Sequence, residues 1–274
     1  LAPMPPAPAL PPGATPWRQV TAAELAAVRG VFTDIDDTLT RDGAIEPEAL
    51  AALQALARAA IPVIAITGRP AGWSEPFALA WPVAAIVAEN GGVMLRRDAS
   101  GALRRDFAQP AGERTANLAR LQACAAAVLR EVPGTALARD SAGRLTDIAV
   151  DHSEFAHLGA AQIERIVALM RAHGLVATVS SIHVNGWIGQ HTKWTAAQWA
   201  VTDLGLGELV PHAWLYVGDS TNDQLMFERL PLSVGVANIA RFWAELRARP
   251  RYVTQAERGQ GFAEVAARLT GGGR

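Results

Sequence analysis

The sequence has a single cysteine, Cys124, no long apolar run and no excess of charge of either sign. One thiol excludes an intrachain disulfide framework and any metal site built from clustered cysteines. The longest apolar stretch, residues 77–88, is well short of the roughly 18–20 residues that cross a bilayer, and Pro82 interrupts it. We therefore expect a soluble protein without a membrane partner.

The charges nearly cancel, with 25 Lys and Arg against 26 Asp and Glu, and they form no basic run. Broad binding of nucleic acid needs a basic surface, so we expect no nucleic-acid partner. Hydrophobic residues make up 50% of the 274 positions, which argues against disorder and provides for a large core. This length predicts one large domain or a core with a second module.

The start of the chain is rich in proline, since residues 1–12 hold six prolines and no charge. Proline favours extended, solvated backbone, so residues 1–20 are predicted to form a Pro-rich flexible leader. The segment lacks the cationic start and long apolar stretch of a secretory signal, and a cytoplasmic location is expected. The capping box Thr21-Ala-Ala-Glu24 predicts the first helix of the folded part.

Short apolar runs alternate with helical patterns in the first and last thirds of the chain. The runs cover residues 31–35, 62–67, 84–88, 213–217 and 232–236. Continuous apolar strands separated by helices indicate an α/β fold, with a Rossmann-like parallel sheet covered on both faces. Ligands of such a sheet gather at the carboxyl ends of its strands.

The pattern differs in the middle of the chain. The predicted elements there are a hairpin over 93–106, a helix over 113–130, strands over 135–139 and 145–151, a helix over 158–173, and strands over 176–180 and 182–187. This mixture predicts an inserted α+β cap domain of residues 96–187. The core domain would then comprise residues 21–95 and 188–274, with a helix near 242–247.

Two acidic turns follow predicted strands that lie far apart in the sequence. Asp34, Asp36 and Asp37 follow the first run, and Asp219 and Asp223 follow the fourth. Buried carboxylates this close repel one another unless a cation or a proton lies between them, and Mg²⁺ prefers carboxylate oxygens. Taken alone, each turn is also compatible with a solvated turn or a helix cap.

A second group of polar residues lies at other element ends. Thr67, Gly68 and Arg69 end the second run, and Lys193 begins a helix. A hydroxyl, the N–H groups of a glycine turn and an ammonium can together hold phosphoryl oxygens. Each is ordinary in isolation, as a turn hydroxyl or a surface lysine. Their order along the chain, between the two acidic turns, favours one shared site.

These four segments, in this order and spacing, resemble the haloacid dehalogenase superfamily. Thr67-Gly-Arg-Pro70, Glu89-Asn-Gly-Gly92 and Gly218-Asp-Ser-Thr-Asn-Asp223 resemble its subfamily IIB, in which a large α/β cap is inserted between the second and third motifs. That subfamily includes sugar-phosphate phosphatases and phosphomannomutases. The resemblance covers about residues 27–270, and Asp37 departs from the glycine that many relatives carry.

The resemblance implies that Asp34 is the nucleophile of an aspartyl-phosphate mechanism and that Asp36 is the general acid and base. It implies that Thr67 and Lys193 hold the transferring phosphoryl group. The implied Mg²⁺ site consists of Asp34, the main-chain carbonyl of Asp36, Asp219 and, directly or at one remove, Asp223.

The candidates for substrate binding lie on the return from cap to core and at strand ends. Alternation along the strand before Lys193 points His183 and Asn185 to one face, and related enzymes turn that face to the active site. The alternative is that both are polar residues on an edge strand. The other candidates are Thr67, Gly68, Arg69, Asn90, Lys193 and Asn222.

The resemblance thus implies a Mg²⁺-dependent phosphatase acting on a small phosphorylated metabolite, with a sugar phosphate as the expected substrate. A phosphosugar mutase would use the same aspartyl-phosphate, and the motifs do not separate the two. From other classes we retain a phospho-accepting receiver domain, which has no inserted cap, and a non-catalytic phosphometabolite-binding protein. The chain is expected to be a monomer or a homodimer.

Overall fold

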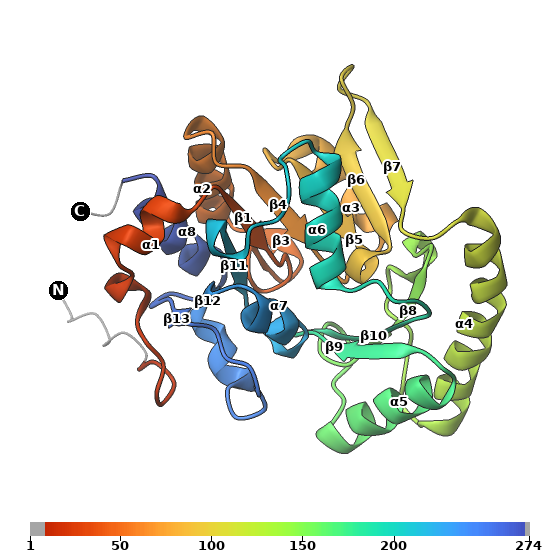
Figure 1. The fold of residues 1–274 in the computed structure, drawn as a ribbon. Helices are drawn as coiled ribbons and strands as arrows, with labels where there is room; N and C mark the ends of the chain where they lie inside the picture. Colours follow the sequence, from red (N-terminus) through yellow and green to blue (C-terminus); the bar gives the residue numbers. More distant parts are fainter. Residues whose placement is uncertain (1–8, 272–274) are drawn as a thin grey trace.

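The structure is a computed structural model and describes residues 9–271. Its central sheet has eight strands in the order β13-β12-β11-β1-β4-β5-β6-β7 (Figure 1). From β13 to β5 neighbouring strands are parallel, whereas β6 and β7 are antiparallel. This confirms the predicted α/β class. The strands are β1 Gly30–Thr33, β4 Val63–Ile66, β5 Ala85–Ala88, β6 Val93–Arg97, β7 Leu103–Phe107, β11 Trp214–Gly218, β12 Leu232–Gly235 and β13 Tyr252–Val253.

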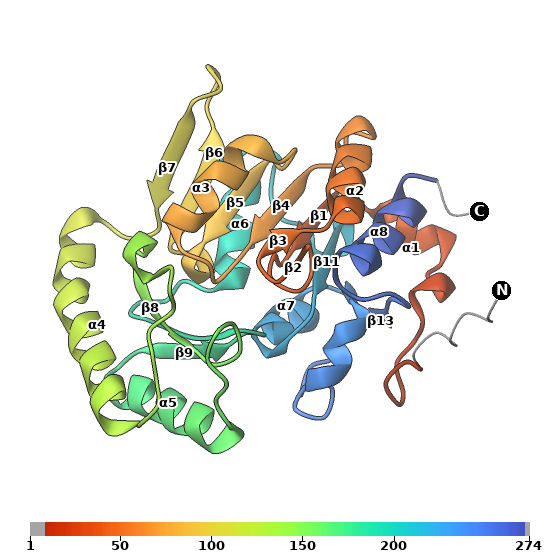
Figure 2. The same cartoon turned by 180° about the vertical axis from the view of Figure 1, so that it is seen from behind.

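Helices cover both faces of this sheet, as Figures 1 and 2 show from opposite sides. Alternate strand residues serve the two faces: Val31 packs into the cluster under α2, α3 and α8, and Phe32 into the cluster under α6 and α7. Every residue of β1, β4 and β5 is buried, which explains their unbroken apolar sequences. The core helices are α1 Ala22–Ala27, α2 Pro47–Arg58, α3 Ala71–Ala80, α6 Lys193–Asp203, α7 Gln224–Arg229 and α8 Arg258–Leu269.

Short elements complete the core. A two-stranded hairpin follows β1, and its turn holds Asp42 and Gly43 at positive φ. The hairpin strands are β2 Thr40–Arg41 and β3 Ala44–Ile45, and the 3₁₀ helices are η1 Trp17–Gln19, η2 Glu89–Gly91, η3 Ser141–Gly143, η4 Pro211–Ala213, η5 Thr221–Asp223 and η6 Ala237–Phe242. The segment after β12 is therefore the 3₁₀ helix η6, and not the helix predicted near residues 242–247.

A separate three-stranded antiparallel sheet, in the order β8-β10-β9, forms the cap. Its helices α4 and α5 pack on the outer face of this sheet, on the side away from the core (Figure 1). Val128, Ile166, Met170 and Val184 are among the buried residues between the two layers. The cap elements are α4 Ala111–Glu131, β8 Asp147–Asp151, α5 Ala160–Ala172, β9 Val176–Val179 and β10 His183–Trp187.

Two features of the cap differ from the expectation. The hairpin of β6 and β7 extends the central sheet by pairing with β5, so the inserted module begins after β7 and not at residue 96. Residues 135–139 do not form a strand, because they meet β8 at a single bridge between Leu137 and Val150. Pairing over one residue leaves this segment an edge loop of the cap sheet.

The predicted flexible leader is wrong for residues 9–20, which pack on the core. Trp17 is 2% exposed and donates its indole N–H to the carbonyl of Glu264 at 3.1 Å. Thr15 accepts a hydrogen bond from Val253 of the edge strand β13, and Trp243 donates to the Pro12 carbonyl. Burial of an aromatic ring and pairing at a sheet edge order these residues despite their prolines. The remaining leader residues, 1–8, lie outside the described residues.

Within residues 9–271 no helix is both long enough and apolar enough to cross a bilayer, and the longest, α4, has 21 residues.

Candidate active site and metal centre

The motif residues meet at the carboxyl edge of the central sheet. β1 lies between β4 and β11, so the segments after these three strands converge although they are distant in the sequence. Asp34 follows β1, Thr67 follows β4 and Asp219 follows β11. The chain turns to opposite sides of β1 in its two halves, and ligands of open α/β sheets bind at such a switch point.

Three carboxylates form the centre of this site. Asp34, Asp219 and Asp223 each offer an oxygen within 4.8 Å of the others, and all three are buried. Burial raises the pKa of Asp34 to about 7; Lys193 opposes this rise, and the negative charges of Asp223 and Asp36 add to it. Burial and the charges of Asp34 and Asp223 also raise the pKa of Asp219. The protein thus confines negative charge that needs a positive counterpart.

Lys193 supplies part of that counterpart. It is the first residue of α6, and its Nζ lies 3.1 Å from Asp34 Oδ1 and 2.9 Å from Asp223 Oδ1. The two carboxylates raise the lysine pKa despite its burial, so the ammonium stays charged. Tyr216 donates its hydroxyl to Asp223 and also contacts the ammonium. Sequence reasoning missed Tyr216, although strand alternation in β11 places it on the α6 face of the sheet.

Asp223 also shapes the turn after β11. Its Oδ2 accepts the main-chain N–H groups of Asp219 at 2.8 Å and Ser220 at 3.1 Å. Asn222 is 9% exposed and its Oδ1 accepts the Ser220 hydroxyl, so it is engaged within the turn. These bonds hold the Asp219 carboxylate towards Asp34.

Thr67 and Gly68 form the second wall of the site. Thr67 is fully buried, and its Oγ1 accepts the N–H of Arg69 at 3.0 Å. A Cβ on Gly68 would lie 3.1 Å from Asn185 Oδ1 and 3.2 Å from Asn90 Nδ2, so a larger residue would have to displace one of the two amides. Asn90 is 1% exposed, and neither of its amide atoms has a hydrogen-bond partner among the described residues.

Asp36 faces a different partner from the other carboxylates. Arg69 grips it with Nε at 3.0 Å from Oδ2 and with Nη2 at 2.9 Å from Oδ1. The guanidinium also pairs with Asp140 and Glu154 of the cap. The Asp36 side chain is therefore not part of the carboxylate cluster. Asp37 has a φ of 55°, which explains why glycine is also suited to this position.

The two cap candidates lie behind these residues. Asn185 donates to the Gly68 carbonyl at 3.1 Å and to Asp147 at 3.1 Å. His183 places Nε2 at 3.4 Å from Glu154 Oε1. Both are buried at the core–cap junction, so the alternative of exposed polar residues on a strand edge does not hold. They support other residues of the site and do not line the cavities next to it.

Glu89 belongs to one of the motifs that carry the resemblance, but its contact with the cap loop was not predicted. Its carboxylate accepts the N–H of Ala71 in the core and those of Leu145 and Thr146 in the cap, at 2.7–3.0 Å. Glu89 is fully buried and has a φ of 53°. Nothing in the spacing of the sequence marks the contact with the cap, because Leu145 and Thr146 lie more than fifty residues away from Glu89.

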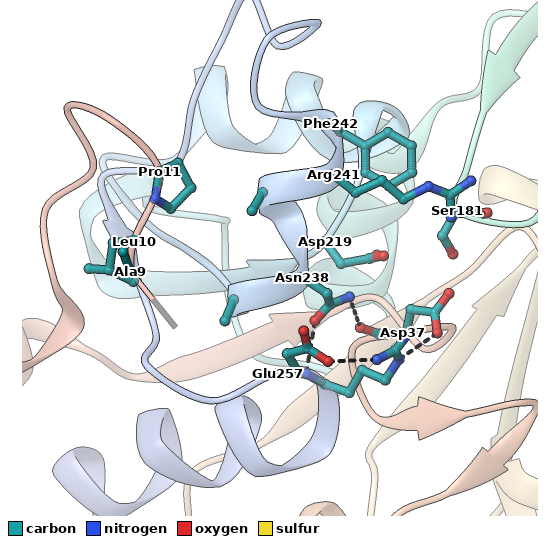
Figure 3. Close-up of a pocket in the computed structure, with 13 residues that line it drawn as sticks. Ala9, Leu10, Pro11, Asp37, Ser181, Asp219, Asn238, Arg241, Phe242 and Glu257 are labelled. Carbon is teal, nitrogen blue, oxygen red and sulfur yellow. Dashed lines mark hydrogen bonds and ion pairs between the residues drawn. The ribbon is translucent and has the colours of Figure 1, made fainter. Parts of the chain in front are cut away.

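Two cavities open beside the carboxylates. The larger has a volume of about 350 Å³ and reaches Asp219 (Figure 3), and the smaller has about 190 Å³ and reaches Asp36. Cap and core residues share their walls, so both cavities lie at the junction of the two modules. The lining residues that the motifs did not reveal include Ser153, Glu154, Phe155, Ser181, Arg241 and Arg258.

The carboxylate cluster fits a divalent cation on chemical grounds. Three carboxylates face one ammonium, which leaves two negative charges in excess. Asp219 Oδ2 is buried and has no hydrogen-bond partner among the described residues. Oxygen donors with this charge are those that Mg²⁺ takes.

Comparison with known proteins finds a family model that matches part of the chain. Residues 31–118 match the family model of haloacid dehalogenase-like hydrolases. No curated protein sequence matches the chain. The matched segment contains both the first acidic turn and the Thr67 turn.

Solved structures share the fold over most of the chain. A protein of Thermoplasma acidophilum has a TM-score of 0.66 at 17% identity, with 88% of this chain and 98% of that chain covered. The sucrose-phosphatase of Synechocystis sp. PCC6803, solved with sucrose and phosphate, has a TM-score of 0.63 at 18% identity over 88% and 98%. A subclass IIB sugar phosphatase of the haloacid dehalogenase superfamily has 0.60 at 12% identity over 88% and 99%. At these identities the likeness concerns the fold.

Proposed function

We propose that the chain, whose residues 31–118 match the family model of haloacid dehalogenase-like hydrolases, is a Mg²⁺-dependent phosphatase of a small phosphomonoester. The expected substrate is a sugar phosphate. One observation carries the proposal: Asp34, Asp219 and Asp223 converge in a buried cluster with Lys193, beside a cavity shared by core and cap. Such a cluster can bring a metal and a phosphoryl group against one carboxylate.

Asp34 is the proposed nucleophile. Its carboxylate lies against Lys193, whose ammonium offsets the repulsion between an anionic carboxylate and an anionic phosphoryl group. Attack of Asp34 on phosphorus forms an aspartyl-phosphate and releases the alcohol, and attack of water on that phosphorus then returns the carboxylate and inorganic phosphate. When bound, Mg²⁺ would neutralise charge on the phosphoryl oxygens. Asp34, the Asp36 carbonyl, Asp219 and Asp223 are the residues that would hold it.

Thr67 and the turn after it are proposed to orient the phosphoryl group. The Thr67 oxygen accepts a bond from Arg69, which leaves the hydroxyl hydrogen for a phosphoryl oxygen. Asn90 turns an unpartnered amide to the same glycine turn. Gly68, Asn90 and Lys193 thus offer donors from three different elements.

Asp36 is proposed to give a proton to the leaving oxygen and to take one from the attacking water. It lines the smaller cavity and is held by Arg69. Because Arg69 also binds cap residues, closing the cap fixes the direction of this carboxyl group. An acid that protonates the leaving oxygen has to lie on the side of the leaving group, and Asp36 is proposed to occupy that side.

The sugar-phosphate class is supported by fold likeness to a sucrose-phosphatase and a sugar phosphatase and by the polar and charged residues that line the smaller cavity. The phosphosugar mutase and the non-catalytic binding protein remain alternatives. A cytoplasmic location and a monomeric or dimeric state stay predictions.

The test is release of inorganic phosphate from a panel of sugar phosphates and from p-nitrophenyl phosphate, with Mg²⁺ and with EDTA. The proposal expects multiple turnovers with Mg²⁺ and almost none with EDTA or in an Asp34→Asn variant. A mutase would instead need a bisphosphate activator and release little phosphate. Absence of turnover on every substrate would support the binding protein.

A further inference from the structure

The two cavities share one wall whose role the proposed reaction does not explain. Asp37, Ser181, Arg241 and Arg258 line both of them. In Figure 3 the Arg241 guanidinium and Ser181 lie together on one side of the larger cavity, with Asp219 facing the space between them and Asp37. The wall therefore adjoins the metal ligand Asp219, and through the smaller cavity it adjoins Asp36.

Arg241 differs from the other arginines of these cavities. Arg69 forms ion pairs with Asp36, Asp140 and Glu154. Arg258 forms ion pairs with Asp37 and Glu257. Arg241 has no carboxylate partner among residues 9–271.

The hydrogen bonds of Arg241 go to neutral groups of the cap, and its guanidinium also lies over the ring of Phe242. Its Nη1 donates to the Ser181 carbonyl at 3.1 Å, and its Nη2 donates to the Ser153 hydroxyl at 2.9 Å. These bonds aim the guanidinium across the core–cap junction and leave other N–H donors for a ligand. An arginine held in this way keeps a full positive charge and a planar fork that suits an anionic oxygen pair.

Ser181 gives an independent indication of a ligand. The residue is 2% exposed, lines both cavities, and its Oγ has no hydrogen-bond partner among the described residues. A buried hydroxyl without a partner is costly, and such groups are found where a ligand completes the hydrogen bonding. Ser181 and Arg241 thus offer a donor and a charge to the same space.

We propose that Arg241 and Ser181 form a subsite for a second anionic group, a carboxylate or a second phosphate, on the leaving group of the substrate. The inference rests on the proposed phosphatase function and narrows its substrate class. The phosphoryl group lies at Asp34 and Asp219, and the second anion lies at the wall that both cavities share. A neutral sugar alcohol would leave the Arg241 charge unused.

The subsite is tested with substrates that differ only in the distant group. The pairs are 6-phosphogluconate against sorbitol 6-phosphate, and 3-phosphoglycerate against glycerol 3-phosphate, for the carboxylate. Fructose 1,6-bisphosphate against fructose 6-phosphate serves for the second phosphate. A charged hydrogen bond to arginine predicts a preference in kcat/KM of roughly 10- to 100-fold for the anionic member of at least one pair.

The variants are Arg241→Gln and Ser181→Ala, with Arg247→Gln as a matched control from the same surface. Arg247 lies outside the two shared cavities. Arg241→Gln is expected to reduce the anionic preference by about tenfold or more through KM, whereas Arg247→Gln keeps the preference of the parent.

Four outcomes separate the possibilities. Loss of preference in Arg241→Gln and a reduced preference in Ser181→Ala, with the preference kept in Arg247→Gln, support the subsite. An equal loss on both members of every pair overturns it, because Arg241 would then only hold the cap closed through Ser153 and Ser181. Phosphate release without any anionic preference in the parent also overturns the subsite while leaving the phosphatase function in place. Failure to release phosphate from any substrate instead contradicts the proposed function.

Discussion

At the scale of single residues, the proposed chemistry is divided between two neighbouring carboxylates, those of Asp34 and Asp36. Asp34 lies against Lys193 in the buried cluster, and Asp36 lies against Arg69 at the cavity on the cap side. Two groups two positions apart therefore meet different cations, because the chain turns sharply between them after β1. This separation is what distinct roles as nucleophile and proton donor require.

The role of Asp36 predicts a dependence on the leaving group. Replacing Asp36 by Asn removes the proton donor but keeps hydrogen bonds to Arg69. We expect kcat for a sugar phosphate, whose alkoxide needs a proton, to fall by roughly 10²–10⁴-fold. For p-nitrophenyl phosphate, whose phenolate leaves without one, the first step should fall far less. Equal losses on both substrates in single-turnover measurements would contradict the assignment.

His152 predicts a pH dependence of stability. Burial lowers the pKa of His152 to about 4, and its Nε2 lies 2.9 Å from the Ser180 carbonyl, to which it must donate. Below the ordinary histidine pKa the unfolded chain gains a proton that the folded protein does not, so this histidine lowers stability as pH falls from about 6.5 to about 4.

The measurement for His152 is the free energy of unfolding by urea across that pH range. His152→Gln should remove a loss of up to about 3 kcal/mol between the two ends of the range. The exposed His212→Gln is the control and should keep the slope of the parent. The account of His152 fails if both variants have the same slope.

The residues that the sequence revealed are those that carry chemistry at strand ends. Asp34, Thr67, Lys193 and Asp219 stand in short motifs, and a parallel sheet brings its strand ends to one edge, so their convergence could be predicted. Residues such as Glu89 and Arg241 act through partners in another module. Their roles depend on how cap and core meet, which local spacing does not encode.

At the scale of elements, strand type was easier to predict than strand pairing. The apolar runs of β1, β4 and β5 follow from burial on both faces. The same local pattern in residues 135–139 yields one bridge to β8, because the cap sheet offers that segment only an edge. The β6–β7 hairpin was predicted as a hairpin, but its pairing with β5 depends on tertiary structure, which the local sequence pattern does not show.

In the N-terminal segment, burial of one aromatic residue, Trp17, holds residues 9–20 against the core. Trp17 packs edge-on to Tyr252 with ring centroids 5.7 Å apart and belongs to the main core cluster. Proline-rich composition favours extended chain but does not prevent it from lying on a sheet edge. The prediction of a flexible leader rested on the prolines and did not consider burial of Trp17.

Trp17→Ala is therefore expected to destabilise the protein by about 3–5 kcal/mol, as truncation of a buried aromatic ring does. Arg18→Ala, at an exposed neighbouring position, should stay within about 0.5 kcal/mol of the parent. Urea unfolding followed by fluorescence or circular dichroism gives both values. Two equally small effects would show that residues 9–20 are a loose leader in solution.

At the scale of the whole molecule, the acidic cluster links distant parts of the chain through repulsion that a cation relieves. Asp34 and Asp219 come from opposite ends of the core sequence, and both have raised pKa values through burial. Folding brings these charges together at a cost that metal binding offsets. The same carboxylates therefore lower the stability of the metal-free protein and provide its proposed metal site.

A thermal-shift experiment with Mg²⁺ follows from this. At a Mg²⁺ concentration about a hundred times its Kd, binding should add about 2.7 kcal/mol of stability. This corresponds to a rise in Tm of roughly 5–10 °C for a chain of this size. Asp219→Asn should abolish the rise and should not lower Tm without Mg²⁺, because it removes a repelling charge. An equal rise in parent and variant would place the metal elsewhere.

The most direct test of the central claim, that Asp34 receives the phosphoryl group within the carboxylate cluster, is chemical trapping of the intermediate. The protein is mixed with Mg²⁺ and a turned-over phosphomonoester, quenched, reduced with borohydride and analysed by peptide mass spectrometry. An acyl phosphate is reduced to an alcohol, so the account predicts homoserine at position 34 and none without substrate. Reduction at another carboxylate, or none at position 34 during rapid turnover, would contradict it.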